Sequence, residues 1–178
     1  MKKCLIVVDY QNDFVSGSLG FPGAAGLEQR IIDKIAKYRD SGDEVVFTFD
    51  THGEDYMETQ EGMNLPVAHC LLGTEGHKLY GRLSGAVQGS DRLFNKDTFG
   101  SDALYMYLKA EEFSAIELVG LVSNICVIAN AVLAKTAQPE TPIHVDASCT
   151  ASHDAHLHQA ALDVMAGLQI NVKQGVSE

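Results

Sequence analysis

Short apolar runs recur along the chain, and several of them end directly in an acid or a base. Residues 4–8 form an unbroken apolar run that stops at Asp9, and residues 44–49 form a second, mostly apolar run that stops at Asp50. Runs that are apolar at nearly every position are typical of strands covered on both faces. We therefore predict two buried strands, each with a carboxylate at its carboxyl end.

The same pattern predicts further strands later in the chain. Residues 92–96 form an extended segment that delivers Lys96 to a loop, and an apolar run around residues 116–119 ends at Gly120. Shorter strands are expected over residues 142–146 and 168–173, before a polar tail.

Helical spacing separates these runs. Apolar positions three to four residues apart predict a helix that stops near Gly42, a helix capped by Ser101, an almost wholly apolar helix over residues 125–133, and a helix over residues 152–166. The residues expected to face the core are Leu27, Ile31, Ile35, Tyr38, Leu104, Leu108, Leu157, Ala161, Val164 and Met165.

Strands that alternate with helices predict an α/β fold. We expect three layers, with a mainly parallel sheet between two layers of helices, in one domain over residues 1–178. Ligands of such sheets bind beyond the carboxyl ends of the strands, where the strand order reverses. Asp9, Asp50, Lys96 and the turn at residues 123–126 all follow strands, so we expect one active site at that edge.

Residues 51–92 lack a long periodic pattern and contain His52, His69 and His77. A segment of that length without regular structure in a compact domain is usually functional. We therefore expect it to contribute ligands or a wall to the site.

Charge excludes several functions. The 178 residues contain 13 Lys and Arg against 24 Asp and Glu, a net charge of −11. A basic stretch that could neutralise nucleic-acid phosphates or anionic lipids is missing, so we expect no nucleic-acid or membrane partner. The apolar run near the N-terminus is too short for a signal peptide, and the 4 cysteines lack CxxC spacing, which favours a cytoplasmic protein.

Cys126 is the candidate nucleophile. It lies at the predicted start of a buried helix, where backbone N–H groups and the helix dipole favour thiolate and can lower a cysteine pKa from ~8.5 to ~3.5–7.5. Asp9 could accept the thiol proton, and Lys96 could stabilise both anions and thereby lower the carboxyl pKa. Taken singly, each residue has an ordinary alternative: a structural cysteine, a loop-capping acid and a surface lysine.

The segments around these residues resemble the isochorismatase-like cysteine hydrolases over nearly the whole chain. The segments are VDYQNDF at residues 8–14, FNKDTF at residues 94–99 and GLVSNICV at residues 120–127. The resemblance implies the isochorismatase-like hydrolase fold and a catalytic triad of Asp9, Lys96 and Cys126. It also implies a cis peptide between Val122 and Ser123 and an oxyanion hole formed by Val122, Ser123 and Cys126.

A second resemblance, to the nicotinamidase branch of that family, is carried by FDTH at residues 49–52 and LPVAHCLLGT at residues 65–74. It implies that Asp50, His52 and His69 bind a divalent metal, commonly zinc, with Glu61 as a candidate fourth ligand. Two imidazoles and one carboxylate with open positions are typical of a catalytic metal site. Threonine stands at position 51 where many nicotinamidases have tryptophan, so Phe14 is the candidate wall for ring stacking.

These residues predict a hydrolase that converts nicotinamide to nicotinate and ammonia through a thioester on Cys126, serving NAD salvage. Two alternatives remain: an amidase of the same family acting on another small amide, carbamoyl or ureido compound, and a catalytically silent binding protein. The expected partner is a small-molecule amide, and the resemblance implies a homo-oligomer.

Several reactive side chains are left out of the predicted site. His153, His156 and His158 are interpreted as a solvated cluster that partly caps a helix, because their spacing scatters them around the helix start. Cys70 is excluded as a ligand because it adjoins His69, and Cys4 and Cys149 are interpreted as core residues.

Overall fold

The computed structural model describes residues 1–173. One sheet of 6 parallel strands has the order β3-β2-β1-β4-β5-β6. Its strands are β1 (Lys3–Val8), β2 (Glu44–Asp50), β3 (Arg92–Lys96), β4 (Ala115–Leu121), β5 (Ile143–Ala151) and β6 (Asn171–Lys173). The strand order reverses between β1 and β4, so the carboxyl ends of these two strands border the crevice where ligands of such sheets bind.

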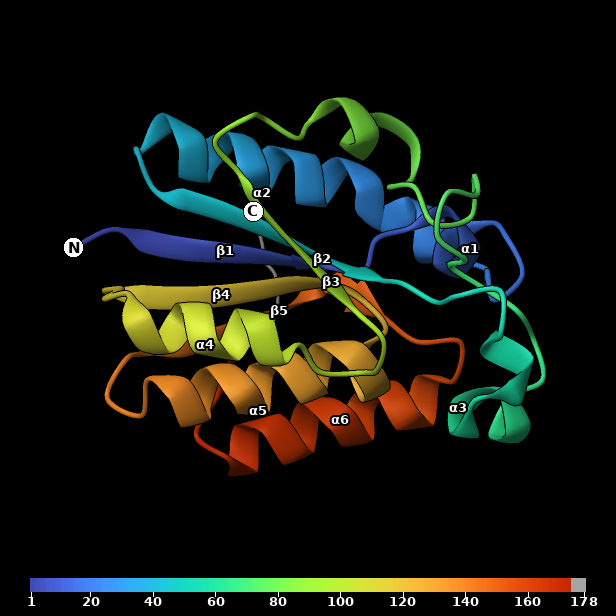
Figure 1. Cartoon of the computed structure of the whole chain (residues 1–178). Coiled ribbons are helices and arrows are strands. Elements are labelled where there is room, and N and C mark those ends of the chain that lie inside the picture. Colours follow the sequence, from blue (N-terminus) through green and yellow to red (C-terminus); the bar gives the residue numbers. More distant parts are fainter. Residues whose placement is uncertain (174–178) are drawn as a thin grey trace.

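Helices cover both faces of the sheet, as predicted (Figure 1). Helix α2 (Glu28–Asp40) lies on one face, and α4 (Asp102–Ala110), α5 (Ile128–Ala137) and α6 (Ala155–Gly167) lie on the other. The core is accordingly divided in two. Alternate residues of β1 contribute to each half: Ile6 and Val8 pack toward α4 and α5, whereas Leu5 and Val7 pack toward α2.

The predicted helices around residues 27–40 and 102–110 are confirmed. In α2, Ile31 and Ile35 are buried on the core face. At the start of α4, the Ser101 hydroxyl accepts a hydrogen bond from the Leu104 backbone N–H at 3.1 Å, as expected of an N-cap. In α6 the prediction of the core face is partly wrong. Leu157 and Val164 are 42% and 53% exposed, and Leu162 is buried in their place beside Ala161 and Met165.

Two strand boundaries also differ from the prediction. β5 continues to Ala151 because its register with β4 shifts and pairing resumes at Gly120 with Thr150, along a stretch of small and polar residues that has no apolar pattern. β6 begins only at Asn171, since Leu168 caps α6 and Gln169 turns the chain at a φ of 63°. The polar tail at residues 174–178 lies outside the described residues.

The segment between β2 and β3 contains only short helical pieces, among them η2 (Tyr56–Glu58), α3 (Gln60–Asn64) and η3 (Gly81–Gly85). Together with α1 (Asn12–Val15), its first half lies at the carboxyl end of the sheet (Figure 1). The long irregular segment therefore lies beside the crevice, as expected from its histidines. η1 (Ala24–Leu27) leads into α2.

Gly120 is required near the end of β4. It adopts a φ of 112°, and a Cβ at this position would lie 2.0 Å from the Val8 carbonyl oxygen. Only glycine permits this close approach of β4 to β1, which brings the residues that follow the two strands together.

No helix within residues 1–173 is both long enough and apolar enough to cross a membrane.

Candidate active site

Asp9, Lys96 and Cys126 meet at the carboxyl ends of β1, β3 and β4. The Lys96 Nζ lies 2.7 Å from Asp9 Oδ2 and 3.6 Å from Cys126 Sγ. All three side chains are buried, with residue exposures of 0%, 5% and 4%. The structure therefore brings together the three residues that the sequence nominated from segments far apart in the chain.

The Asp9 carboxylate is held by its neighbours on β2. The Thr48 hydroxyl donates to Asp9 Oδ1 at 2.6 Å, and Asp9 itself adopts a φ of 43°, a conformation that Asp tolerates better than most residues. Burial raises the pKa of Asp9, and the attraction of Lys96 offsets only part of this effect. Lys96 thus lowers the pKa of Asp9, as expected, but the predicted net fall of that pKa is wrong, because complete burial penalises the charged form more than one lysine stabilises it.

The pKa of the Cys126 thiol also differs from the expectation. Burial and then the negative charge of Asp9 raise the pKa of Cys126 well above its ordinary value, and Lys96 compensates in part. The helix start thus does not produce a resting thiolate. A buried thiol beside a carboxylate of raised pKa suits a proton transfer from sulfur to Asp9 when an electrophile arrives.

Cys126 lies in a π-helical turn, η4 (Ser123–Val127), which joins β4 to α5. The backbone N–H groups of Ile125 and Val127 both donate to the Val122 carbonyl, at 3.2 and 3.1 Å. The cis peptide joins Leu121 to Val122 and not Val122 to Ser123, so the predicted position is wrong by one bond. Val122 is the extended residue that caps the turn, so the cis bond lies directly before the turn and not within it.

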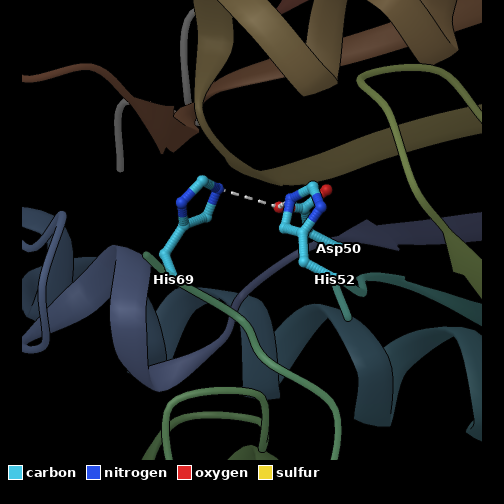
Figure 2. A group of neighbouring side chains, drawn as sticks. All are labelled: Asp50, His52 and His69. Carbon is cyan, nitrogen blue, oxygen red and sulfur yellow. Dashed lines mark hydrogen bonds and ion pairs between the residues drawn. The ribbon is translucent and has the colours of Figure 1, made fainter. Parts of the chain in front are cut away.

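Asp50, His52 and His69 form a second cluster (Figure 2), which Lys96 joins to the first. Asp50 Oδ2 lies 3.0 Å from His52 Nε2 and 3.2 Å from His69 Nε2, and the three ligand atoms lie within 4.8 Å of one another. His69 Nδ1 donates to the Val67 carbonyl at 2.8 Å, which orients the ring so that Nε2 faces Asp50 and is the nitrogen that could bind a metal.

This donor set fits a divalent metal. Two imidazole nitrogens and one carboxylate converge, all three residues are buried, and three protein ligands leave positions open for water or substrate. Hydrogen bonds from both imidazoles and the charge of Lys96 outweigh burial and hold the pKa of Asp50 well below its usual range. The carboxylate is therefore ionised at neutral pH, as a metal ligand must be.

Glu61 and Phe14 lie at the edge of this cluster. Glu61 Oε1 is 3.8 Å from His52 Nε2 and 3.7 Å from His69 Nε2, close to both histidines but outside the group of three that could share one ion. The Phe14 ring centroid lies 5.5 Å from that of His69.

Lys96 connects the two clusters. Its Nζ donates to Asp50 Oδ1 at 3.0 Å while it also contacts Asp9 and Cys126. Burial alone would lower the pKa of Lys96, but the attraction of its acidic neighbours, above all Asp9, outweighs burial and raises this pKa, so the ammonium stays charged. The nucleophile, the proton acceptor and the candidate metal ligand therefore surround one buried cation.

Sequence reasoning missed several residues that support the site. The Gln11 side-chain amide donates to the Asp50 carbonyl at 2.9 Å and accepts from the Asp50 N–H at 2.8 Å, which ties β2 to the segment after β1. The Tyr56 ring lies 4.7 Å from His52 and 4.9 Å from His69, measured between ring centroids. Gln11 lies within the first motif, and its burial could have been suspected, but no local pattern marks Thr48 or Tyr56.

The predictions for the cysteines and histidines left out of the site are confirmed only in part. Cys70, Cys4 and Cys149 are buried, and none belongs to the metal group. Asp154, and not a histidine, caps α6. The interpretation of His158 as solvated is wrong, because it is partly buried and its Nδ1 lies 2.9 Å from the Ser123 hydroxyl.

Comparison with known proteins identifies the family. Residues 3–174 match the family described as Isochorismatase domain. The chain belongs to this family. As a family member it is similar to the crystal structure of nicotinamidase PncA from Bacillus subtilis, with 30% identity, a TM-score of 0.84, and coverage of 98% of this chain and 100% of that one.

Two further relatives extend the comparison. This chain is 29% identical to the nicotinamidase/pyrazinamidase of Mycobacterium tuberculosis over 177 residues, which cover 92% of this chain and 94% of the relative. The pyrazinamidase of Pyrococcus horikoshii, solved in complex with zinc, shares the fold with a TM-score of 0.85 at 21% identity, and the match covers 98% of this chain and 99% of that one.

Proposed function

We propose that the protein is a cysteine-dependent amidohydrolase that converts nicotinamide and water to nicotinate and ammonia. The observation that carries the proposal is the position of Lys96, whose Nζ contacts Asp9, Asp50 and Cys126 at once. This contact joins a nucleophile with its proton acceptor to a donor set suited to a metal. The relatives named nicotinamidase support the choice of substrate.

The first half of the reaction forms a thioester. Asp9 takes the proton of the Cys126 thiol, and the sulfur attacks the amide carbon while the carbonyl π electrons move to oxygen. Backbone N–H groups of the turn at residues 122–126 stabilise that oxyanion. The C–N bond then breaks, the nitrogen takes the proton from Asp9, and ammonia leaves.

The second half releases the acid. Water attacks the thioester carbon and gives a proton to Asp9, the C–S bond breaks, and the sulfur recovers that proton as the acid leaves. Lys96 remains charged throughout and offsets the negative charge that alternates between Asp9 and Cys126. The raised pKa of Asp9 makes its carboxylate a stronger base than an ordinary aspartate, which suits it to accept the thiol proton and return it.

A divalent cation, zinc as the first candidate, would be held by Asp50, His52 and His69. When bound, it supplies a Lewis-acidic anchor that orients the substrate beside the thiol. Phe14, next to His69, would form part of the wall against the substrate ring. Glu61 would act on this site through its charge or through an intervening water.

The test is ammonia release from nicotinamide by the purified protein, before and after removal of metal with a chelator. We expect turnover that is abolished in Cys126→Ala, reduced by chelation and restored by zinc. Cys149→Ala is the matched control, since it removes a buried thiol on β5 without touching the site, and it should keep full activity.

Two results would contradict the proposal. Rapid alkylation of Cys126 without turnover of nicotinamide would indicate a different small amide, a carbamoyl or a ureido substrate. The absence of both turnover and alkylation would indicate a binding protein.

A further inference from the structure

The turn that contains the nucleophile is held by side chains from outside it. Within residues 1–173, the side chains that reach the turn at residues 122–127 by hydrogen bonds are Lys96, Asn130 and His158. Lys96 contacts the sulfur, and Asn130 donates to the Cys126 carbonyl at 2.8 Å. His158 is the residue of α6 among these three, and it has no part in the proposed chemistry.

The bond from His158 joins two groups of different exposure. Ser123 is fully buried, whereas His158 is only partly buried in the first turn of α6. The His158 Nδ1 and the Ser123 Oγ are 2.9 Å apart. A buried hydroxyl needs a partner, and His158 is the partner that the described residues provide.

Ser123 occupies a sensitive position in the chain. It directly follows Val122 and precedes Cys126 by three residues, so it lies within the turn whose backbone N–H groups are proposed to stabilise the oxyanion. Donors of this kind act only when they are already oriented before the reaction. Partial burial lowers the pKa of His158, so the ring is uncharged at neutral pH and acts on the turn through geometry and not through charge.

We propose that His158 is a positioning residue that fixes the oxyanion-binding turn through the Ser123 hydroxyl. The inference rests on the proposed thiol-dependent hydrolysis and adds a residue of α6 to it. The bond orients N–H groups that matter in the transition state, so its loss should lower kcat and leave KM nearly unchanged. It does not touch Asp9 or Lys96, so the nucleophilicity of the thiol should not depend on it.

The test compares three variants at position 158. His158→Ala should lower kcat for nicotinamide about tenfold, less than the loss of a whole oxyanion donor, which costs ~10²–10³-fold. His158→Asn places a polar atom near the position of Nδ1 and should recover most of the activity. His158→Gln places its polar atoms near the position of Nε2 and should not.

Further measurements separate positioning from general damage. Ser123→Ala should lower kcat as much as His158→Ala, and the double variant should be no slower than either single variant, since both remove one bond. Alkylation of Cys126 by iodoacetamide should stay within about twofold of wild type, because that reaction forms no oxyanion. His156→Ala, at an exposed position on the same helix, is the matched control and should behave as wild type.

The possible outcomes are distinct. An unchanged kcat in His158→Ala, equal rescue by Asn and Gln, or additive losses in the double variant would overturn the inference while leaving the proposed function intact. Alkylation that slows in parallel with kcat would overturn it as well, because the defect would then lie in the thiol. Wild-type protein without turnover would refute the proposed function and, with it, this role of His158.

Discussion

At the scale of single residues, the environment of Asp9 decides the acid–base chemistry. Its carboxylate is fully buried, accepts from the Thr48 hydroxyl at 2.6 Å and lies 2.7 Å from the Lys96 ammonium. Both contacts lower the pKa of Asp9, whereas burial raises it by more, so the pKa of this carboxyl group lies above its ordinary value. The raised pKa of Asp9 is therefore the balance of named contacts, each of which can be altered.

Thr48→Val removes the hydroxyl but keeps the shape of the side chain. A hydrogen bond to a charged group contributes ~1.5–3 kcal/mol, and its loss raises the pKa of Asp9 further, because the ionised carboxylate loses a donor. We expect kcat to fall about tenfold and the acid limb of its pH profile to move about one unit toward higher pH. Steady-state kinetics between pH 4 and 9 would measure both.

The control for this variant is Thr136→Val, which removes an exposed hydroxyl from α5 that donates to the Val132 carbonyl. It should change neither kcat nor the pH profile. An acid limb that stays in place in Thr48→Val would show that Asp9 is not the group that titrates in the reaction.

At the scale of elements, an ion network joins α2 to β4 and β5. The Lys34 Nζ lies 3.0 Å from Glu117 Oε1 and 2.5 Å from Asp146 Oδ2, and the Tyr38 hydroxyl donates to Glu117 Oε2 at 2.6 Å. Burial would raise the pKa of Glu117, but the bonds from Tyr38 and Lys34 outweigh it and lower the pKa overall. The pKa of Asp146 is lowered by Lys34 and Ser148 in the same way.

The sign of the pH dependence follows from these directions. A carboxylate whose pKa is lower in the folded protein stabilises the fold above its unfolded pKa, about 4.3 for Glu and 3.9 for Asp, and loses this contribution as the pH falls through the folded pKa. We expect the free energy of unfolding, measured in urea, to decline below about pH 4.5. In Glu117→Gln the decline should be shallower, and stability at pH 7 should fall by ~3–5 kcal/mol, as for other broken buried ion pairs.

Glu75→Gln is the matched control for the network. Glu75 pairs with Lys78 at the surface, with side-chain exposures of 83% and 58%, and exposed pairs of this kind contribute little. Its unfolding curve should follow wild type at every pH. Equal acid sensitivity of wild type and Glu117→Gln would locate the titrating groups elsewhere.

Prediction from sequence succeeded for elements with a strong period and failed where tertiary contacts take over. Helix α2 repeats its apolar residues every three to four positions, and its core face was predicted correctly. The second half of β5 has no such pattern, and only pairing with β4 after the register shift makes it a strand. In α6, the choice of Leu162 over Val164 depends on how the helix docks against the sheet.

At the scale of the whole molecule, the candidate metal site joins the end of β2 to the irregular segment that follows it. Asp50 ends the strand, whereas His69 lies in the segment before β3. A metal that binds the folded protein alone stabilises it by ~2.7 kcal/mol at a free concentration 100 times the Kd. For a chain of this length, we expect zinc added after chelation to raise the Tm by about 5–10 °C.

The metal prediction has a readout independent of activity. His69→Asn should bind less zinc, measured by elemental analysis, and should show little rise in Tm, whereas His153→Asn, at an exposed position, should respond as wild type does. An equal rise in Tm in wild type and His69→Asn would show that zinc binds elsewhere on the protein.

The sequence by itself determined the succession of strands and helices along the chain, the residues at the strand ends and the candidate nucleophile, acid and lysine, and the resemblance to a known family added the candidate metal ligands. These are local properties: apolar period, strand-end position and residue type can be identified within short segments. Only the tertiary structure decided which polar groups meet, because a local pattern carries no information on which strands are neighbours. The order β3-β2-β1-β4 brings Lys96 to Asp50, complete burial raises the pKa of Asp9 and Cys126, and the docking of α6 brings His158 to Ser123 across 35 positions.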